Sequence, residues 1–177
     1  MKKIVAFGAS SSKNSINKKF AIYATSQLSK VVVEVLDLND YEMPIFSVDK
    51  EVENGIHPLA VNFKEKLKTA DGFIISFAEH NGAYSAAYKN IYDWVSRIEK
   101  SFWGDKPLFL MATSTGAKGG KSVLKMAFKR YNFANDNDVF QFSLPSFQTT
   151  FSEEIGIVDE ELNSEFLEKL RKFENIL

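Results

Sequence analysis

Residues 3–17, KIVAFGASSSKNSIN, decide the fold of this chain. Lys3–Gly8 is a short, continuous apolar run, which is typical of a strand buried on both faces. Small hydroxyl and amide side chains follow it directly, and then an amphipathic segment begins, Ser15–Ser29. A buried strand that leads through a polar turn into a helix is the opening unit of an α/β protein.

The rest of the chain repeats this alternation. Continuous apolar runs predict further strands at Val31–Leu38, Gly72–Phe77, Pro107–Thr113 and Val139–Leu144. Apolar residues at helical spacing predict helices at Pro58–Thr69, Ala83–Ile98, Lys121–Tyr131 and Asp159–Leu177, whereas Tyr41–Ile56 is expected to be irregular. Strands separated by helices predict a parallel sheet covered on both faces, and right-handed crossovers favour a doubly wound fold.

The composition is that of an ordinary globular protein, and residues 1–177 are expected to form a single domain. Lys and Arg (22) balance Asp and Glu (23), which argues against a nucleic-acid or membrane partner, and no apolar run is long enough to span a bilayer. Cysteine is absent and there are only two histidines, so we expect no metal site. The lack of cysteine and of a signal segment predicts a cytoplasmic protein.

The turn after the first strand is a candidate phosphate site. In doubly wound sheets, ligands bind beyond the carboxyl ends of the strands. Gly8–Asn17 crowds hydroxyls and amides around a helix N-terminus, where free backbone N–H groups and the helix dipole favour an anion. Simple capping of the helix by Ser15 or Asn14 is the alternative. Gly8 is the only glycine here, so the turn lacks a dinucleotide fingerprint.

The turns after the third and fourth strands are suited to a flat ligand. In Ala78–Gly82, the glycine permits a tight turn or a close backbone approach, and Glu79 and His80 are wall residues in preference to an acid–base pair. Ser114–Ser122 is rich in glycine, and its N–H groups are suited to a carbonyl edge. Its ending resembles a P-loop, but Thr115 stands where the first glycine is required, which argues against nucleotide hydrolysis.

Together the three turns predict a planar, phosphorylated ligand, with the phosphate on the first turn and the ring between the other two. A mononucleotide at the edge of a five-stranded parallel sheet is the flavodoxin-like arrangement. We therefore predict an α/β, flavodoxin-like three-layer sandwich, with strand order 2-1-3-4-5 and helices on both faces.

Three segments resemble the NADPH-dependent FMN reductases, a flavodoxin-like family that includes quinone, chromate and azo-dye reductases. Residues 12–17 (SKNSIN) resemble the family's phosphate loop, and residues 113–120 (TSTGAKGG) resemble its glycine-rich loop. The most specific match is EHNG at 79–82 followed by KNIYDW at 89–94, similar to E-Y-N-G…K-N-x-x-D-W. The resemblance spans roughly residues 1 to 150.

The resemblance implies roles for particular residues. The phosphate of FMN would be held by Ser10, Ser12, Ser15, Ile16 and Asn17. Glu79, His80, Asn81 and Gly82 would line the isoalloxazine, and its pyrimidine edge would meet Ser114, Thr115, Gly116 and Gly119. Lys89, Asn90, Asp93 and Trp94 would fix a helix or pack a dimer, and for Trp94 packing within its own chain is an equal alternative.

The implied protein is an FMN-dependent NAD(P)H oxidoreductase that passes electrons to a quinone, a flavin or a similar small acceptor. The flavin carries the chemistry, so no catalytic side chain is assigned. The family's Arg in the phosphate loop is absent and its ring-stacking Tyr is His80, which leaves NADH or NADPH and the acceptor open. A homodimer or homotetramer is expected; Phe102 and Trp103 belong either to such an interface or under the sheet edge. The alternatives are a flavodoxin-type FMN electron carrier and a non-enzymatic binding module on the same fold.

Overall fold

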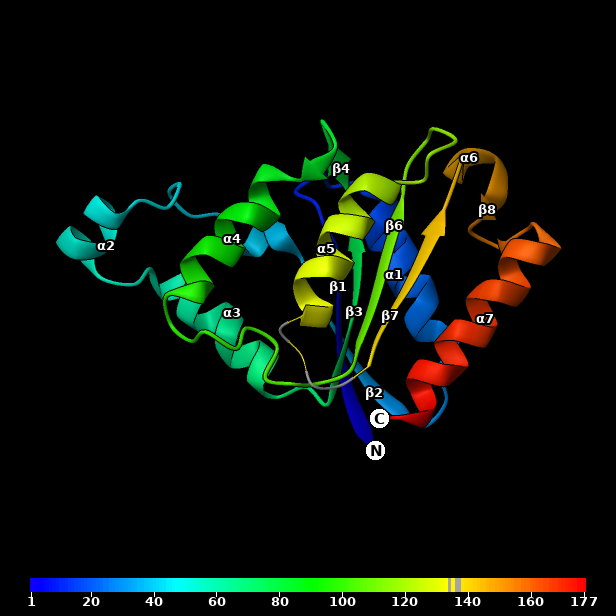
Figure 1. The fold of residues 1–177 in the computed structure, drawn as a ribbon, viewed down its shortest axis with the longest axis horizontal. Helices are drawn as coiled ribbons and strands as arrows, with labels where there is room; N and C mark the ends of the chain where they lie inside the picture. Colours follow the sequence, from blue (N-terminus) through cyan, green and yellow to red (C-terminus); the bar gives the residue numbers. More distant parts are fainter. Residues whose placement is uncertain (134, 136–137) are drawn as a thin grey trace.

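The computed structural model describes residues 1–133, 135 and 138–177. Five parallel strands form the central sheet: β1 (Lys2–Ala9), β2 (Val31–Val35), β3 (Gly72–Phe77), β6 (Leu108–Thr113) and β7 (Val139–Leu144). Their order is β2-β1-β3-β6-β7, so the predicted order 2-1-3-4-5 and the flavodoxin-like fold are confirmed (Figure 1).

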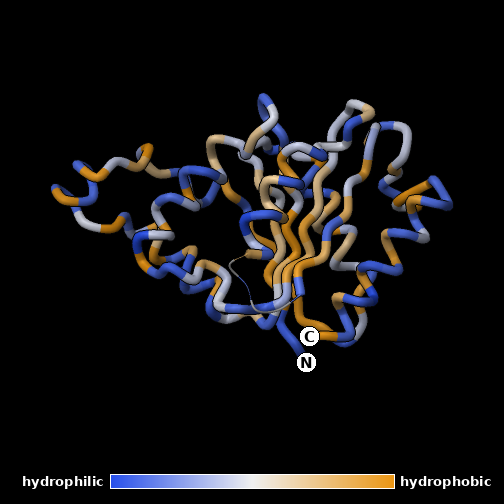
Figure 2. The backbone as a smooth tube through the Cα atoms, viewed as in Figure 1, coloured by the Kyte–Doolittle hydropathy of each residue, from blue (hydrophilic) through white to orange (hydrophobic). Residues whose placement is uncertain are grey.

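The sheet is the apolar centre of the molecule, as Figure 2 shows by colour. All six residues of β3 and of β6 are buried, because helices cover both faces of these central strands. The edge strand β2 differs: Val32, Val33 and Val35 are between 37% and 47% exposed. Because only one side of β2 has a neighbouring strand, its valines are less completely covered than those of the centre.

Two layers of helices enclose the sheet. On one face α1 (Ile16–Ser26) and α7 (Glu160–Asn175) pack around Phe20, Phe109 and Phe166. On the other face lie α3 (Pro58–Lys68), α4 (Ala86–Ser96) and α5 (Lys121–Phe133), over a core that contains Phe7, Phe63 and Tyr88. The helices predicted from apolar spacing are thus confirmed, each within a few residues at its ends.

The segment predicted to be irregular, Tyr41–Ile56, contains one helix, and a second, short helix ends at its first residue. A short 3-10 helix, η1 (Leu38–Tyr41), follows β2, and α2 (Val48–Asn54) lies on an arm that projects away from the sheet (Figure 1). Ser47 caps α2 by accepting a hydrogen bond from Lys50 N at 3.2 Å. No residue of α2 is buried, so apolar periodicity could not reveal this helix.

The K-N-x-x-D-W segment of α4 holds this arm. The Asn90 side chain donates to Met43 O at 3.0 Å and accepts from Phe46 N at 2.8 Å. Trp94 Nε1 donates to Pro44 O at 2.8 Å. Of the two readings for Trp94, the structure shows the one within the chain.

Two small hairpins and one helical turn were not expected from the sequence: β4 (Glu79–His80) with β5 (Ala83–Tyr84), β8 (Phe151–Ser152) with β9 (Gly156–Ile157), and α6 (Phe147–Thr150). The first hairpin moves the start of α4 from the predicted residue 83 to Ala86. Phe102 and Trp103 are each 5% exposed, and the Trp103 ring meets Phe73 edge-on with 4.9 Å between centroids. They therefore lie under the sheet rather than on its surface. Within the described ranges, none of the helices is long and apolar enough to cross a membrane.

Candidate functional site

The carboxyl ends of β1, β3 and β6 surround a hollow of about 270 Å³. It is lined from all three predicted turns, by Ser10, Ser12, Asn14, Ser15, Ile16, Asn17, Ala78, Glu79, His80, Thr113, Ser114 and Thr115. Segments separated by some 60 and 100 positions in the sequence thus meet at one edge, as the parallel topology requires.

The first turn presents backbone donors to this hollow. Ser15 caps α1, since its Oγ accepts from Lys18 N at 3.2 Å, and Ser10 Oγ accepts from Ser12 N at 3.1 Å. Among the residues that the structure describes, the backbone N–H groups of 11, 13, 14, 16 and 17 have no protein partner. Such a set of free donors at the positive end of a helix binds an anion well.

Gly8 brings this helix end close to the sheet. A Cβ atom at position 8 would lie 2.4 Å from Lys18 N and 2.8 Å from Asn17 C, which no real side chain tolerates. Only glycine lets the first turn of α1 approach β1 so closely.

Asn17 fixes the same turn from inside the protein. It is 3% exposed, and its Oδ1 accepts from Ser76 Oγ at 2.7 Å and from Thr113 N at 3.1 Å. Its Nδ2 donates to Thr113 O at 3.2 Å. The side chain therefore ties α1 to β3 and β6, and it leaves one amide hydrogen and the backbone N–H for a ligand.

The second turn is a tight β-hairpin. Asn81 (φ 52°) and Gly82 (φ 76°) occupy its two central positions, and His80 pairs with Ala83. Two consecutive positive φ values define the turn that Asn-Gly favours between antiparallel strands. His80 is exposed and projects with the hairpin beside the hollow.

Glu79 acts on the neighbouring helix. Its Oε2 accepts from the backbone N–H groups of Ser122 and Val123, both at 3.0 Å, in the first turn of α5. The carboxylate therefore satisfies two orphan donors and opposes the positive end of the helix. The structure thus shows Glu79 as a partner of the α5 terminus that also lines the hollow.

The third turn is closed against β7. Gly119 (φ 58°) is buried, and a Cβ there would meet Ser143 Oγ at 2.6 Å and Pro145 N at 2.8 Å. In contrast, a Cβ at Gly116 would meet nothing nearer than Ser114 Oγ at 4.0 Å. Gly119 thus permits chain packing, while residues 115–118 stay exposed at the rim.

Aromatic side chains support the hairpin from below. The Tyr88 and Tyr131 hydroxyls are hydrogen-bonded to each other in the core, and burial raises the pKa of both well above the usual value. Burial also raises the pKa of Tyr84 to about 12, and its hydroxyl has no hydrogen-bond partner of sound geometry within the described chain. These phenols stay neutral near pH 7, so we assign them to the scaffold.

Most predicted site residues line the hollow: Ser10, Ser12, Ser15, Ile16, Asn17, Glu79, His80, Ser114 and Thr115. Asn81 and Gly82 form the hairpin tip, Gly116 lies exposed on the third turn, and Gly119 is buried, so these four stand outside its lining. Three lining residues were not predicted: Asn14, Ala78 and Thr113. The sequence signal that could have identified them is their position in the three turns quoted above.

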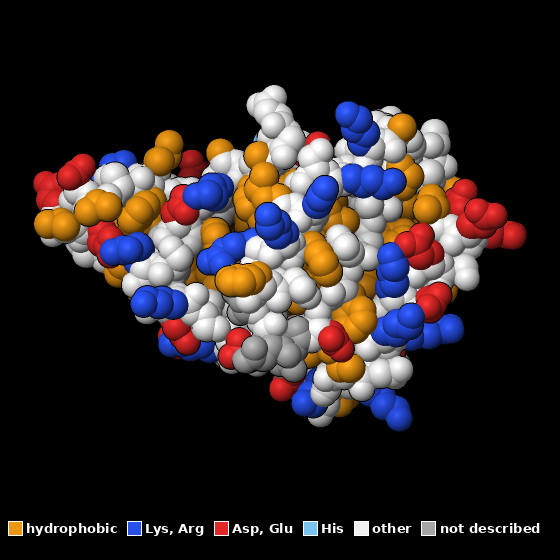
Figure 3. All heavy atoms as spheres, in the orientation of Figure 1, with side chains coloured by type: hydrophobic (Ala, Val, Ile, Leu, Met, Phe, Trp, Pro, Cys, Tyr) orange, Lys and Arg blue, Asp and Glu red, His pale blue; other side chains and the backbone are white. Residues whose placement is uncertain are grey.

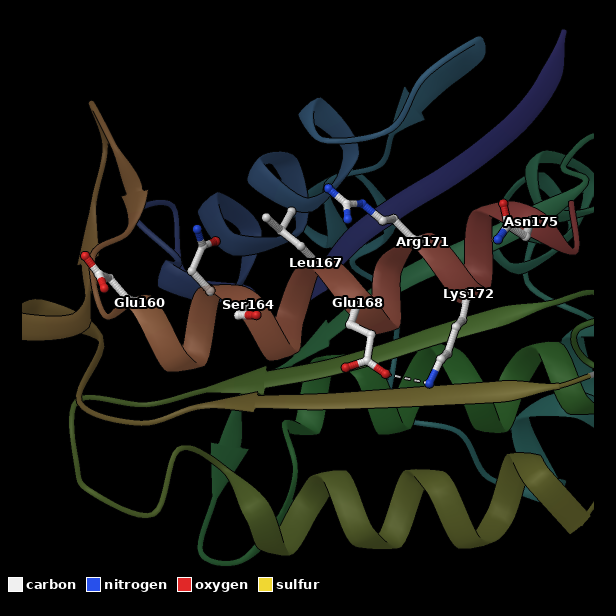
Figure 4. A pocket seen from close by; sticks show the side chains of 8 residues that line it. Glu160, Ser164, Leu167, Glu168, Arg171, Lys172 and Asn175 are labelled. Atoms are coloured by element: carbon white, nitrogen blue, oxygen red, sulfur yellow. Dashed lines mark hydrogen bonds and ion pairs between the residues drawn. The ribbon is translucent and has the colours of Figure 1, made fainter.

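Other hollows do not share this chemistry. One of them, of about 670 Å³, is an open trough along α7 whose lining comes from that helix alone (Figure 4). Its polar groups include the Glu168–Lys172 ion pair, and none of its lining residues comes from the three turns. In the part of the chain that the structure describes, no cluster of His, Asp or Glu is arranged to hold a metal ion.

A doubly wound parallel sheet with this strand order and helices on both faces defines a flavodoxin-like fold. The family model for NADPH-dependent FMN reductases matches residues 2–148. The chain therefore belongs to the NADPH-dependent FMN reductase family, and the resemblance noted from its motifs is confirmed. The description of that family names FMN and NADPH, the cofactor and the reductant that the motifs implied.

Individual relatives agree. An NADPH:quinone oxidoreductase of Arabidopsis thaliana is 31% identical over 134 residues, covering 72% of this chain and 65% of the relative. This chain thus spans just under two thirds of that protein. A flavoenzyme NAD(P)H:(acceptor) oxidoreductase from Paracoccus denitrificans has a TM-score of 0.77 at 17% identity, covering 99% of this chain and 97% of the other. An NADH:FMN oxidoreductase in its apo form has a TM-score of 0.75 at 18% identity, covering 100% and 90%. The two structures show a shared fold.

Proposed function

We propose that this chain is an FMN-dependent NAD(P)H oxidoreductase that reduces a quinone or a similar small acceptor. The observation that carries the proposal is the set of free backbone N–H groups at residues 11–17, which open into a hollow walled by the other two turns. Membership of the family and the quinone-reducing relatives supply the reaction class.

The residues present fit the cofactor. The free donors of the first turn and the hydroxyls of Ser10 and Ser12 would hold the phosphate. His80 and the hairpin on one side, with Ser114 and Thr115 on the other, would border the ring. Once bound, FMN accepts hydride from a nicotinamide and returns electrons to an acceptor.

The protein's own part is to hold and orient. The buried amide of Asn17, the close approach at Gly8 and the Glu79 contact with α5 fix the three turns relative to one another. The proposal assigns no proton transfer to a side chain of the protein. A rigid rim is what a cofactor enzyme needs, because the reacting atoms belong to the cofactor and substrates.

We further propose that residues 1–177 act as one domain in the cytoplasm and associate as a homodimer or homotetramer. Phe102 and Trp103 are buried within the chain, so they do not contribute to such an interface. The exposed apolar side chains of the arm, Ile45 (77%), Val48 (61%) and Val52 (81%), are better suited to one. Sedimentation of the purified protein tests this association.

The test of function compares FMN with riboflavin, which lacks the phosphate. We expect the protein to bind FMN, and NADPH or NADH to bleach the bound flavin until a quinone restores its colour. A carboxylate introduced by Ser12→Asp should weaken FMN binding at least about tenfold through like-charge repulsion while leaving riboflavin binding unchanged. Ser26→Asp, near the other end of the same helix, is the matched control.

Three results would contradict the proposal. If FMN did not bind, the site would be wrong. If bound FMN were bleached only by a partner reductase and never by a nicotinamide, the protein would be an electron carrier. If Ser12→Asp weakened FMN and riboflavin equally, the phosphate would not lie on the first turn.

A further inference from the structure

The charge of this chain is unevenly distributed. Over the whole sequence 22 basic residues face 23 acidic ones, yet between Asp105 and Asp136 there are six Lys or Arg and no Asp or Glu. Lysines at 118, 121, 125 and 129 lie in the third turn and on α5. We call these four the lysine ridge. All four are exposed, and none forms an ion pair within the described chain.

The ridge begins at the rim of the candidate site. Lys118 follows the lining residue Thr115 by three positions, so their Cα atoms are at most about 11 Å apart. Lys121 directly precedes Ser122, whose N–H is bound by Glu79. From Lys121 to Lys129 the row extends about 12 Å along the helix, at 1.5 Å per residue. Figure 3 shows basic side chains gathered over α5 and the turn before it.

Local helix physics disfavours this placement. The N-terminal end of a helix is its positive end, where cations are unfavourable and acidic residues are preferred. The first turn of α5 contains no acidic residue and begins with Lys121, preceded by Lys118. Glu79 offsets part of this field from outside the helix. Residues that break a local rule beside a binding site are candidates for a functional role.

We propose that the lysine ridge recognises the phosphates of the nicotinamide reductant and thereby selects NADPH over NADH. The inference rests on the proposed function, and it assigns the selectivity to residues of α5 rather than to the first turn, where no arginine is available. A nucleotide whose nicotinamide reaches the hollow can lay its phosphates along the ridge. NADPH, which carries an additional 2′-phosphate, then gains more binding free energy from each lysine than NADH does, because Coulomb attraction scales with charge.

The test removes two cations from the ridge and two from the opposite edge. Lys121→Gln/Lys125→Gln is the ridge variant. Lys30→Gln/Lys100→Gln is the control, because both residues are exposed, lie in segments that precede β2 and β6, and form no ion pair with the described residues. Both variants change the net charge equally. We measure kcat/KM for NADPH and NADH on the FMN-loaded protein between 20 and 500 mM NaCl.

We expect the ridge variant to lose about five- to tenfold in kcat/KM for NADPH at low salt and less than about twofold for NADH, with the difference vanishing at high salt. Calorimetric titration with NADP⁺ and NAD⁺ gives a second readout, in which only NADP⁺ binding should weaken. The ridge variant should also unfold at a slightly higher temperature than the wild type, since cations leave the positive end of α5.

The inference would be overturned if the ridge variant lost equally for both nucleotides, if the control variant lost as much as the ridge variant, or if the NADPH preference did not depend on salt. The oxidoreductase proposal would stand in each of these cases. If the FMN-loaded wild-type protein oxidised neither nucleotide, the proposed function would fall, and this inference with it.

Discussion

Replacing Asn17 with alanine tests whether a buried amide holds the candidate site together. The change removes the acceptor of Ser76 Oγ and Thr113 N and the donor to Thr113 O. An orphaned buried polar group costs about 1–3 kcal/mol. The Ser76 hydroxyl can rotate to another partner, so only the N–H and C=O of Thr113 are counted as orphaned. Water can approach them from the hollow, so each is expected to cost a free energy in the lower half of that range. The expected loss is about 2–4 kcal/mol of unfolding free energy.

The assay is urea and thermal unfolding of the protein without added flavin. For a chain of this size each kcal/mol shifts the melting temperature by about 2–4 °C, so the drop should be about 4–16 °C. Asn14→Ala is the matched control, because Asn14 lies in the same turn and lines the same hollow, but is exposed and makes no side-chain hydrogen bond to the described protein. It should change stability by less than about 0.5 kcal/mol.

Asn17→Asp separates the two halves of the amide. The carboxylate still accepts hydrogen bonds, but it repels Thr113 O and any phosphate on the first turn. We expect FMN affinity to fall more than riboflavin affinity in this variant. If Asn17→Ala unfolded within about 0.5 kcal/mol of the wild type, the amide would not be the brace that its contacts indicate.

Three other changes probe the remaining turns and the sheet edge. Gly119→Ala should cost at least about 1–3 kcal/mol, from positive φ and the clash with Pro145, while Gly116→Ala should be nearly neutral; urea midpoints distinguish the two. Glu79→Ala should cost about 1 kcal/mol and make the stability less dependent on salt, because a capping charge is lost from α5; salt-dependent unfolding curves check this. Two lysines hold the pKa of Glu34 below its ordinary value, so its contribution is present above about pH 4.5 and lost as pH falls through the lowered pKa; Glu34→Gln should therefore lose up to about 1 kcal/mol at pH 7 and little at pH 3.

The strands were predictable because burial leaves a direct trace in the sequence. Gly72–Phe77 and Val139–Leu144 have the predicted bounds. Gly72–Phe77 is buried at every position, as a central strand covered on both faces should be, whereas the edge strand Val139–Leu144 still buries Val139, Phe142 and Leu144. Val31–Leu38 was predicted too long: the strand ends at Val35, and Leu38 opens a 3-10 helix capped by Asp37. Apolar residues continue across this boundary, from the partly exposed valines of β2 to the buried Leu36 and Leu38, so hydropathy alone does not mark it.

The candidate site was predictable in location and less so in detail. Parallel topology places the three turns at one edge, whatever their internal structure. The Asn81-Gly82 pair is a hairpin signal that the sequence does contain, but only its glycine was interpreted, as a tight turn or a site of close backbone approach. The brace formed by Asn17 was not predictable, because its partners on β3 and β6 are distant in sequence and nothing local distinguishes a buried amide from an exposed one.

The close approach at Gly8 has a consequence for protein engineering. The close packing of the first turn of α1 on β1 depends on the absence of a side chain at Gly8, since a Cβ there would collide with the backbone of residues 17 and 18. Any larger residue at position 8 would lift the start of α1 away from the sheet and carry the donor groups with it. A redesign for a different cofactor therefore has more freedom at the exposed residues 11–14 than at the glycine beneath them.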